Sequence, residues 1–362
     1  MKNLAFSSAE AATAVGRALR NAFIACLPAA IGGALFSWLA LPAAWLTGGL
    51  LLSSVAAVVV PPPRLHSAIK TIAITLLGLA IGASLTPDVF TAWTKWPASL
   101  IVLLFALAGM FAAPYFVLRW GFHLPPLTAF WAASPGALTA SLALAEEAGA
   151  DVKAVAAIHM TRVLVVSLLL PFIVPQPDAG HLASNAAPFS ILTLLALFAI
   201  ASAAGWAFKA ASIPGGTLLG AFASTGALAA SGTVSFTMPA PVTAAACVVF
   251  AASIAGQFAG VKPATISRLL AASAAACLAG MIASILFSWG AASLLHVPFA
   301  QVLISYAPGG IDVLILVAYM LGADPAFVSA HQFVRLTALV LVLPFAGRLV
   351  TPGTPDAPRS SR

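Results

Sequence analysis

Charged residues are scarce in this sequence, and their scarcity excludes a soluble protein. Only 7% of the 362 residues are Asp, Glu, Lys or Arg, whereas 62% are hydrophobic. About a quarter of the residues in a typical soluble domain are charged. Apolar runs recur along nearly the whole chain, and most approach the roughly 20 residues that a helix needs to cross the hydrocarbon layer. The composition therefore predicts a polytopic membrane protein.

Alternation of apolar and polar residues is also missing, which excludes a membrane β-barrel. Runs such as 101–113 and 269–287 are apolar on every side, so we predict an all-α fold. The three cysteines, Cys26, Cys247 and Cys277, lie far apart inside apolar segments. This spacing indicates neither disulfides nor a metal site. The net charge of +7 comes from scattered Lys and Arg, which do not form the basic face of a nucleic-acid-binding protein.

What the sequence does contain is a repeat. Ser134-Pro135-Gly136 returns 173 residues later as Ala307-Pro308-Gly309, and the same offset relates Arg162 to Arg335. A constant offset across so long a stretch indicates an internal duplication. We expect four parts in the chain, namely a cytoplasmic segment, a first membrane repeat, a second membrane repeat and a disordered tail, at 1–20, 21–175, 186–350 and 351–362.

The positive charges distinguish two topologies. Six apolar segments are expected in each half, near 21–40, 44–60, 69–86, 97–118, 126–145 and 154–174, and near 188–208, 213–230, 241–258, 269–290, 297–320 and 325–347. If all six crossed, the halves would share one orientation, and five basic residues would lie outside: Lys95, Lys153, Lys209, Lys262 and Arg268. If the Pro-Gly segment turns back, only Lys95 lies outside. Since cytoplasmic loops are enriched in Lys and Arg, we predict two inverted repeats of five transmembrane helices. Both termini are then cytoplasmic, in the inner membrane.

Each repeat also contains a re-entrant or broken Pro-Gly element, which we predict to form the substrate site. Irregular backbone at membrane depth is tolerated only where it is buried in protein or lines a cavity. Paired broken elements indicate a midplane site in secondary transporters. The predicted substrate-binding residues of the two elements are Ser134, Pro135, Gly136, Pro308, Gly309 and Gly310.

Arg162 and Arg335 lie near the middle of apolar runs, too deep to reach the membrane surface comfortably. A charge inside a membrane indicates function, and paired guanidinium groups suit an anionic substrate. Alternatively, each Arg binds the free carbonyl groups of the neighbouring broken element. The two roles can coexist.

Three further residues are candidates for binding a coupling ion. His159 and His331 precede the arginines by three and four residues and share or flank their helix faces. Because they are not related by the constant offset, we expect polar core histidines rather than a metal site, with proton coupling as the alternative. Asp312 is the carboxylate of the second Pro-Gly element, and it either binds a cation or caps a helix. Asp151 and Asp324 are predicted N-caps.

At Pro308-Gly309-Gly310, Gly322-Ala323-Asp324 and Phe333-Val334-Arg335-Leu336 the sequence resembles the AbrB family of bacterial inner-membrane proteins. The resemblance implies a duplicated membrane domain. Members carry two labels, ammonia monooxygenase and regulator of gene expression. The six histidines, at 66, 123, 159, 181, 296 and 331, lack ligand spacing, so we expect no enzyme, metal or cofactor.

The sequence therefore favours a secondary transporter that moves a small anionic or zwitterionic metabolite by alternating access. The alternative is a membrane-embedded ligand sensor that affects gene expression indirectly. The expected partners are membrane lipid and a small-molecule substrate, together with H⁺ or Na⁺ as a coupling ion, and not nucleic acid. Substrate identity, transport direction and oligomeric state are left open.

Overall fold

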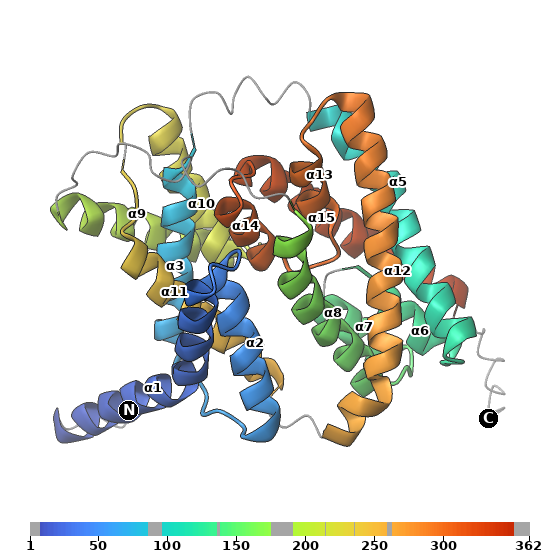
Figure 1. The fold of residues 1–362 in the computed structure, drawn as a ribbon, viewed down its shortest axis with the longest axis horizontal. Coiled ribbons are helices and arrows are strands. Elements are labelled where there is room, and N and C mark those ends of the chain that lie inside the picture. Colours follow the sequence, from blue (N-terminus) through green and yellow to red (C-terminus); the bar gives the residue numbers. More distant parts are fainter. Residues whose placement is uncertain are drawn as a thin grey trace, which may run out of the picture. The chain divides into compact units, whose positions relative to one another are not determined.

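The protein is helical throughout the part of the chain that the structure describes. This computed structural model describes residues 8–85, 96–135, 138–174, 191–213, 215–234, 236–258 and 263–350, and all regular elements in these ranges are helices (Figure 1). The chain divides into two compact units, and each unit combines segments from both halves of the sequence. Unit 1 comprises residues 1–96, 167–263 and 311–329, and unit 2 comprises 97–166, 264–310 and 330–362.

Unit 1 consists mainly of two sets of three helices and one short helix. The first set is α1 (Ser8–Trp38), α2 (Ala44–Val59) and α3 (Ser67–Ala83); the second is α9 (Ile191–Ala210), α10 (Gly216–Ala230) and α11 (Ala240–Ala255), followed by the turn η4 (Gly256–Phe258); the short helix is α14 (Ile311–Met320). Helix α1 packs on α2, α9 packs on α10, and α3 packs on both α10 and α11.

Glycines allow these helices to approach closely. A Cβ atom on Gly32 of α1 would lie 2.1 Å from the carbonyl oxygen of Gly48 on α2. Likewise, a Cβ atom on Gly78 of α3 would lie 2.7 Å from the Ala221 side chain on α10. Without a hydrophobic drive between helices in lipid, such contacts supply the packing energy.

Unit 2 holds the elements in which the sequence singled out functional residues. These are α5 (Trp96–Phe116) after its first residue with its π-helical end η2 (Val117–Gly121), α6 (Pro126–Ala133), α7 (Leu138–Glu147), α8 (Val152–Ile173) up to Val166, α12 (Pro263–Leu295) after its first residue, α13 (Phe299–Tyr306), and α15 (Pro325–Val350) from Ala330 onward. A buried core cluster of this unit includes Trp131 of α6, Ile158 of α8, Ala276 of α12 and Leu339 of α15.

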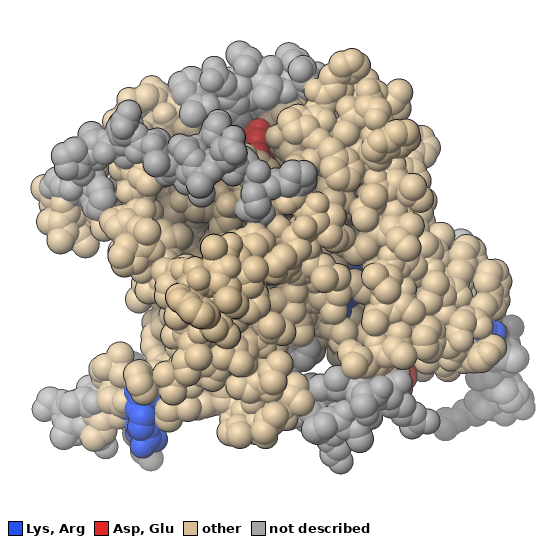
Figure 2. All heavy atoms as spheres, in the orientation of Figure 1, with Lys and Arg blue, Asp and Glu red and all other residues tan. Residues whose placement is uncertain are grey.

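Six helices are long and apolar enough to cross a membrane. They cover Val15–Trp38, Trp96–Gly121, Val152–Ile173, Ile191–Ala210, Leu269–Leu295 and Pro325–Leu343, and five shorter apolar helices accompany them in the described ranges. Large apolar side chains lie exposed on these helices, for example Phe105 and Leu286. Figure 2 shows a face of the molecule on which few charged atoms of the described residues appear. The fold is therefore that of a multi-pass membrane protein, as the composition predicted.

Most of the predicted apolar segments coincide with helices. The first helix begins at Ser8, earlier than the first predicted apolar segment at 21–40. Alanine favours helix, and the stretch before that segment contains Ala11, Ala12 and Ala18. Because alanine is only weakly hydrophobic, the hydropathy of the sequence does not mark where the helix begins. The segments 126–145 and 297–320 are each divided into two short helices, in keeping with the predicted breaks.

The Gly32 contact gives a test of the packing. We expect Gly32→Ala to lower the free energy of unfolding by about 1–3 kcal/mol, because the added methyl group overlaps the Gly48 carbonyl and forces the helices apart. Gly16→Ala on the same helix is the matched control, since nothing lies within 4 Å of its Cβ position. Thermal unfolding in detergent measures both variants, and equal stability of the two would contradict the close approach.

Candidate functional site

The first helix break follows from proline chemistry. Helix α6 ends at Ala133, and Ser134 leaves the helix with φ −59° and ψ 124°. Ser134 precedes Pro135, whose ring disfavours helical backbone in the residue before it. Proline also lacks the N–H that a continuing helix would need. The helix resumes as α7 at Leu138.

The second break has the same cause. Helix α13 ends at Tyr306, and Ala307 has φ −57° and ψ 138°, again as the residue before a proline, Pro308. Helix α14 starts at Ile311. Residues 307–310 therefore form a non-helical stretch, which we call the second break.

Helices α6 and α7 fold back on each other as a hairpin. The backbone N–H of Asp151, just beyond α7, donates to Thr128 Oγ1 in the first turn of α6, at 3.1 Å. Near the tip, Ser134 Oγ and Ser141 Oγ lie 2.7 Å apart. The chain thus enters and leaves this element at the same level.

The two predicted helix caps are confirmed. Asp151 Oδ1 accepts hydrogen bonds from the backbone N–H groups of Lys153 and Ala154, and Asp324 Oδ1 accepts one from Ala326. These are N-cap contacts at the starts of α8 and α15. The preceding helices end at Glu147 and Met320. Two residues later, Gly149 and Gly322 have φ of +75° and +66°, the left-handed conformation in which glycine commonly terminates a helix.

Arg335 holds the backbone of the second break. Its Nη1 donates to the carbonyl of Ala307 and its Nη2 to the carbonyl of Gly309, the latter at 2.7 Å. The residue is only 1% exposed, and its Nε has no hydrogen-bond partner. The planar fork of an arginine fits two adjacent acceptors in a way that lysine cannot. The structure thus gives Arg335 the backbone-binding role that the sequence left as one of two possibilities.

Arg162 has a side-chain partner instead. Its Nη2 donates to His159 Nδ1 at 3.0 Å, and His159 Nε2 donates to the Trp131 carbonyl at 2.9 Å. A carbonyl only accepts and a guanidinium only donates, so the imidazole is neutral with its proton on Nε2. Arg162 is 5% exposed, and its Nε is without a hydrogen-bond partner. His159 is therefore the polar core histidine that we expected, and it orients Arg162.

Next to Arg335, the side chain of Gln332 binds a backbone carbonyl as His159 does next to Arg162. Gln332 Nε2 donates to the carbonyl of Ser305 at 2.9 Å, just before the second break. Gln332 follows His159 by the repeat offset of 173 residues, and both side chains bind the last turn of a helix that leads into a break. The sequence analysis did not single out Gln332, although its alignment with His159 was a usable signal.

His331 takes part in a separate buried network. Tyr306 OH donates to the Ser99 carbonyl at 2.6 Å, and the hydroxyl groups of Ser99 and Tyr306 lie 3.2 Å apart. His331 Nε2 lies 2.9 Å from Ser99 Oγ. Because the Tyr306 proton is used, Ser99 donates to Tyr306 and His331 donates to Ser99. The network joins α5, α13 and α15, and Ser99 and Tyr306 could not be found from the sequence because they are distant along the chain.

Among the described residues of unit 2, no buried carboxylate is present to pair with Arg162 and Arg335. The two guanidinium groups repel each other. The described carboxylates of unit 2 are those of Glu146, Glu147 and Asp151, and all three residues are exposed. The described residues in the centre of unit 2 therefore contribute two positive charges and no negative one.

Asp312, the remaining acidic candidate, belongs to unit 1. It lies in the first turn of α14, and its Oδ1 is buried without a hydrogen-bond partner. That oxygen lies 2.7 Å from the position of a Cβ atom on Gly215, the residue that precedes α10. Helix N-termini stabilise negative charge, so this position suits a carboxylate.

Among the other predicted site residues, Ser134, Pro135, Pro308 and Gly309 are buried in unit 2 and Gly310 is partly exposed, while Gly136 lies outside the described residues. Unit 2 thus brings together all of the described candidates except Asp312. In the part of the chain that the structure covers, no three His, Cys, Asp or Glu side chains group as metal ligands.

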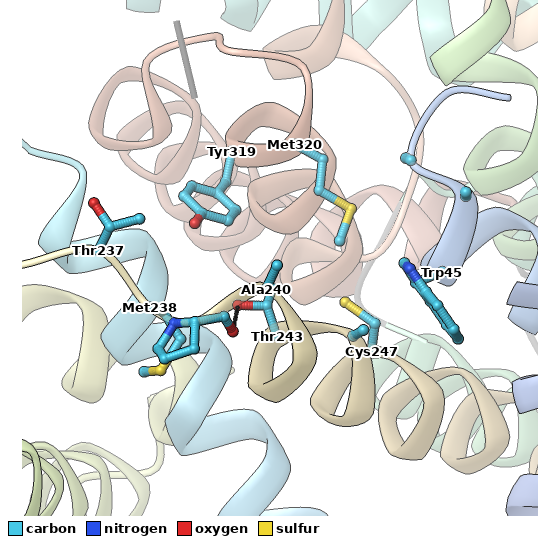
Figure 3. A pocket seen from close by; sticks show the side chains of 12 residues that line it. Trp45, Thr237, Met238, Ala240, Thr243, Cys247, Tyr319 and Met320 are labelled. Atoms are coloured by element: carbon cyan, nitrogen blue, oxygen red, sulfur yellow. Dashed lines mark hydrogen bonds between the residues drawn. The ribbon is translucent and has the colours of Figure 1, made fainter. Parts of the chain in front are cut away.

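Unit 1 contains a cavity of about 570 Å³ that includes none of these residues. Figure 3 shows Trp45, Met238, Cys247, Tyr319 and Met320 around it. Thr243 also lines it, but its hydroxyl donates to the Pro239 carbonyl of its own helix at 3.5 Å. The lining is mostly apolar and carries no charged side chain among the described residues, so it lacks the cationic groups that unit 2 offers to an anion.

The sequence profile of a family described as "Transition state regulatory protein AbrB" matches residues 45–351. The chain belongs to the AbrB family. It is 27% identical over 293 residues to a protein of Escherichia coli (strain K12) described as "Putative regulator AbrB", covering 77% of this chain and 82% of the relative. It is also 25% identical over 350 residues to YhjN of Bacillus subtilis (strain 168), covering 89% and 91%. This AbrB-family chain is thus similar to both relatives over most of their lengths.

The pairing of His159 with Gln332 gives a test of the site. We expect His159→Leu to destabilise the protein by about 1–3 kcal/mol, because the Trp131 carbonyl and an Arg162 N–H lose their partner. His159→Gln is the matched control, since an amide can donate to Trp131 and accept from Arg162. Thermal unfolding in detergent compares the two. Equal losses in both variants would mean that the imidazole ring itself, rather than its two hydrogen bonds, is required.

Proposed function

We propose that this AbrB-family protein is a secondary transporter that moves a small anionic or zwitterionic metabolite by alternating access. The single observation that carries the proposal is the uncompensated positive charge in unit 2. Arg162 and Arg335 are both buried and repel each other, and the described carboxylates of the unit are exposed. Buried charges are costly unless they are paired, so an anion bound between or beside the guanidinium groups would relieve that cost.

The hydrogen bonds divide the work between the two arginines. Arg335 uses two of its donors to bind the carbonyl groups of the second break. It would therefore act on a ligand mainly through its charge and by holding the backbone of the break in place. Arg162 has one described hydrogen bond, to His159, and more donors remain for a ligand. We therefore assign the direct contact with the carboxylate of the substrate to Arg162, in bidentate geometry.

We also propose that the two halves are inverted repeats with five crossings each. Helix starts support the duplication, since α3, α6, α7 and α8 begin 173 residues before α11, α13, α14 and α15. The hydrogen bond between Thr128 and Asp151 supports a re-entrant first element, because both of its ends lie at one level. An odd number of crossings per repeat would invert the halves and place two broken elements toward the midplane.

The coupling ion is proposed to be H⁺ or Na⁺, carried by Asp312 or His331. His159 is the third candidate, and both of its ring nitrogens hold partners. Asp312 has a buried carboxylate oxygen with a free acceptor site. His331 sits one helical turn before Arg335 and next to Tyr306, which borders the second break. No enzymatic step is part of the proposal.

A ligand sensor is the second candidate, and the description of the E. coli relative as a regulator favours it. A sensor would bind the same anion at Arg162 without moving it across the membrane. Binding alone therefore does not separate the two functions, whereas flux does.

Flux through proteoliposomes tests the function. We expect uptake of at least one member of a panel of labelled mono- and dicarboxylates and amino acids, and loss of that uptake in Arg162→Gln, because the variant removes the free donors and one charge. Arg119→Gln is the matched control, since it removes a charge from the same unit at a residue that donates to the Leu124 carbonyl of its own turn. Saturable binding of a panel member without flux would favour the sensor.

The topology can be tested separately with single cysteines. We expect Lys153→Cys and Lys209→Cys, both at exposed positions, to react with an impermeant thiol reagent only from the cytoplasmic side, in a background without native cysteines. Lys95→Cys should react only from the opposite side, because it is the one basic residue predicted outside. Reaction of positions 153 and 209 from the outside would mean that the repeats share one orientation.

A further inference from the structure

Helix α12 carries a row of small polar side chains along its buried face. We call Ser273, Cys277, Ser284 and Ser288 the α12 polar stripe. At 3.6 residues per turn, spacings of four, seven and four residues keep all of them within one face of the helix. All four are buried. The opposite face carries the exposed side chains Leu278, Ile282, Leu286 and Trp289, which suit lipid.

The hydroxyl groups of the stripe lack hydrogen-bond partners. Ser273, Ser284 and Ser288 each have a buried Oγ without one. Serine and threonine in a helix often bond to the carbonyl four residues earlier, as Ser305 and Thr337 do here. A buried hydroxyl without a partner costs about 1–3 kcal/mol. Three such groups on one face are therefore poorly explained by packing alone.

The stripe also passes the two features on which the proposed function rests. Helix α12 packs against the helix that carries Arg162, since Ala276 of α12, next to Cys277, and Ile158 of α8, four residues before Arg162, belong to one buried cluster. Gly280, on the flank of the same face, lies next to the second break, since its Cβ position is 3.7 Å from Pro308 Cγ. Arg162 is nineteen-twentieths buried, and its Nε has no hydrogen-bond partner. A buried free donor on a helix that packs against α12 points to a ligand rather than to a packing seam.

The length of the stripe indicates a route rather than a point of binding. From Ser273 to Ser288 it rises roughly 22 Å along the helix axis at 1.5 Å per residue, most of the roughly 30 Å hydrocarbon layer. The residues 173 positions earlier, on α5, are Leu100, Leu104, Phe111 and Tyr115. None of these four residues is a serine, although α5 carries the buried Ser99 one position before Leu100. The serines of the stripe therefore have no direct counterparts on α5.

We propose that the α12 polar stripe is the polar wall of the passage through which the anion moves past Arg162. This inference rests on the proposed function and extends it. Neutral hydroxyl groups donate hydrogen bonds to a carboxylate but bind it less strongly than a cationic side chain would. An anion could therefore move along the stripe without being held tightly at one position. The absence of acidic side chains from the stripe suits an anion and disfavours a metal cation.

Thiol labelling tests the passage without knowledge of the substrate. The first reporter is the native thiol of Cys277 in the variant Cys26→Ala/Cys247→Ala. Two further reporters, Ser284→Cys and Ser288→Cys, are introduced one at a time into a background that also lacks Cys277. The probe is an anionic, membrane-impermeant methanethiosulfonate applied to reconstituted protein. We expect these positions to be modified, whereas Ile282→Cys on the lipid face stays unmodified because thiolates do not form in lipid.

Arg162→Gln supplies the second measurement. With Cys277 as the reporter, we expect the variant to slow the anionic reagent by about tenfold, the low end of electrostatic steering, and not to slow a cationic reagent of similar size. A change that merely loosened the fold would speed both reagents, so opposite responses identify a route that attracts anions.

The results separate the passage from the transport proposal. If the stripe positions and Ile282→Cys react equally, or if the stripe reacts only after denaturation, the passage is overturned even in a protein that transports solute. If the stripe is labelled selectively while no solute moves in the flux assay, the passage stands as a water-filled route, and transport is the proposal that fails.

Discussion

Backbone groups released by a broken helix must find partners inside the protein, because lipid provides none. The structure meets this constraint with long polar side chains from the following helices. Arg335 and Gln332 of α15 bind carbonyl groups at the end of α13 and in the second break, and His159 of α8 binds a carbonyl near the end of α6. The breaks, the buried polar residues and the positive centre of unit 2 are consequences of one requirement.

The same requirement explains why charge accumulates where a ligand could use it. A neutral amide such as that of Gln332 satisfies a carbonyl at little electrostatic cost, whereas a guanidinium adds a charge that burial makes expensive. Two arginines in one unit, with the described carboxylates exposed, exceed what backbone satisfaction demands. In the first half His159 already binds the Trp131 carbonyl, so Arg162 is not needed to satisfy that backbone group. This surplus is the physical basis for assigning the ligand contact to Arg162 rather than to Arg335.

Local chemistry made part of this structure predictable from the sequence. Pro135 and Pro308 ended helices because of their ring geometry, Asp151 and Asp324 capped helices through short-range contacts, and the arginines stood out as charges in apolar runs. The partners that come from distant segments were not predictable. Ser99 meets Tyr306 and His331 across more than 200 residues, and nothing in the local pattern of α5 marks Ser99. The division of each half between the two units could not be predicted either, because it depends on which helices pack together. The glycines indicate only that another helix comes close, and not which one.

The division into units gives the second break a particular position in the chain. Unit 2 ends one of its segments at Gly310 and unit 1 resumes at Ile311, so the polypeptide leaves one unit for the other inside the break. Arg335 binds the carbonyls of Ala307 and Gly309 on the unit 2 side of this junction, while Asp312 follows on the unit 1 side, in the first turn of α14. On the proposed function, an anion next to Arg162 would weaken the repulsion that Arg335 experiences and strengthen its hold on those carbonyls. Occupancy of the site would then act on a short non-helical link, which resists bending far less than a continuous helix does.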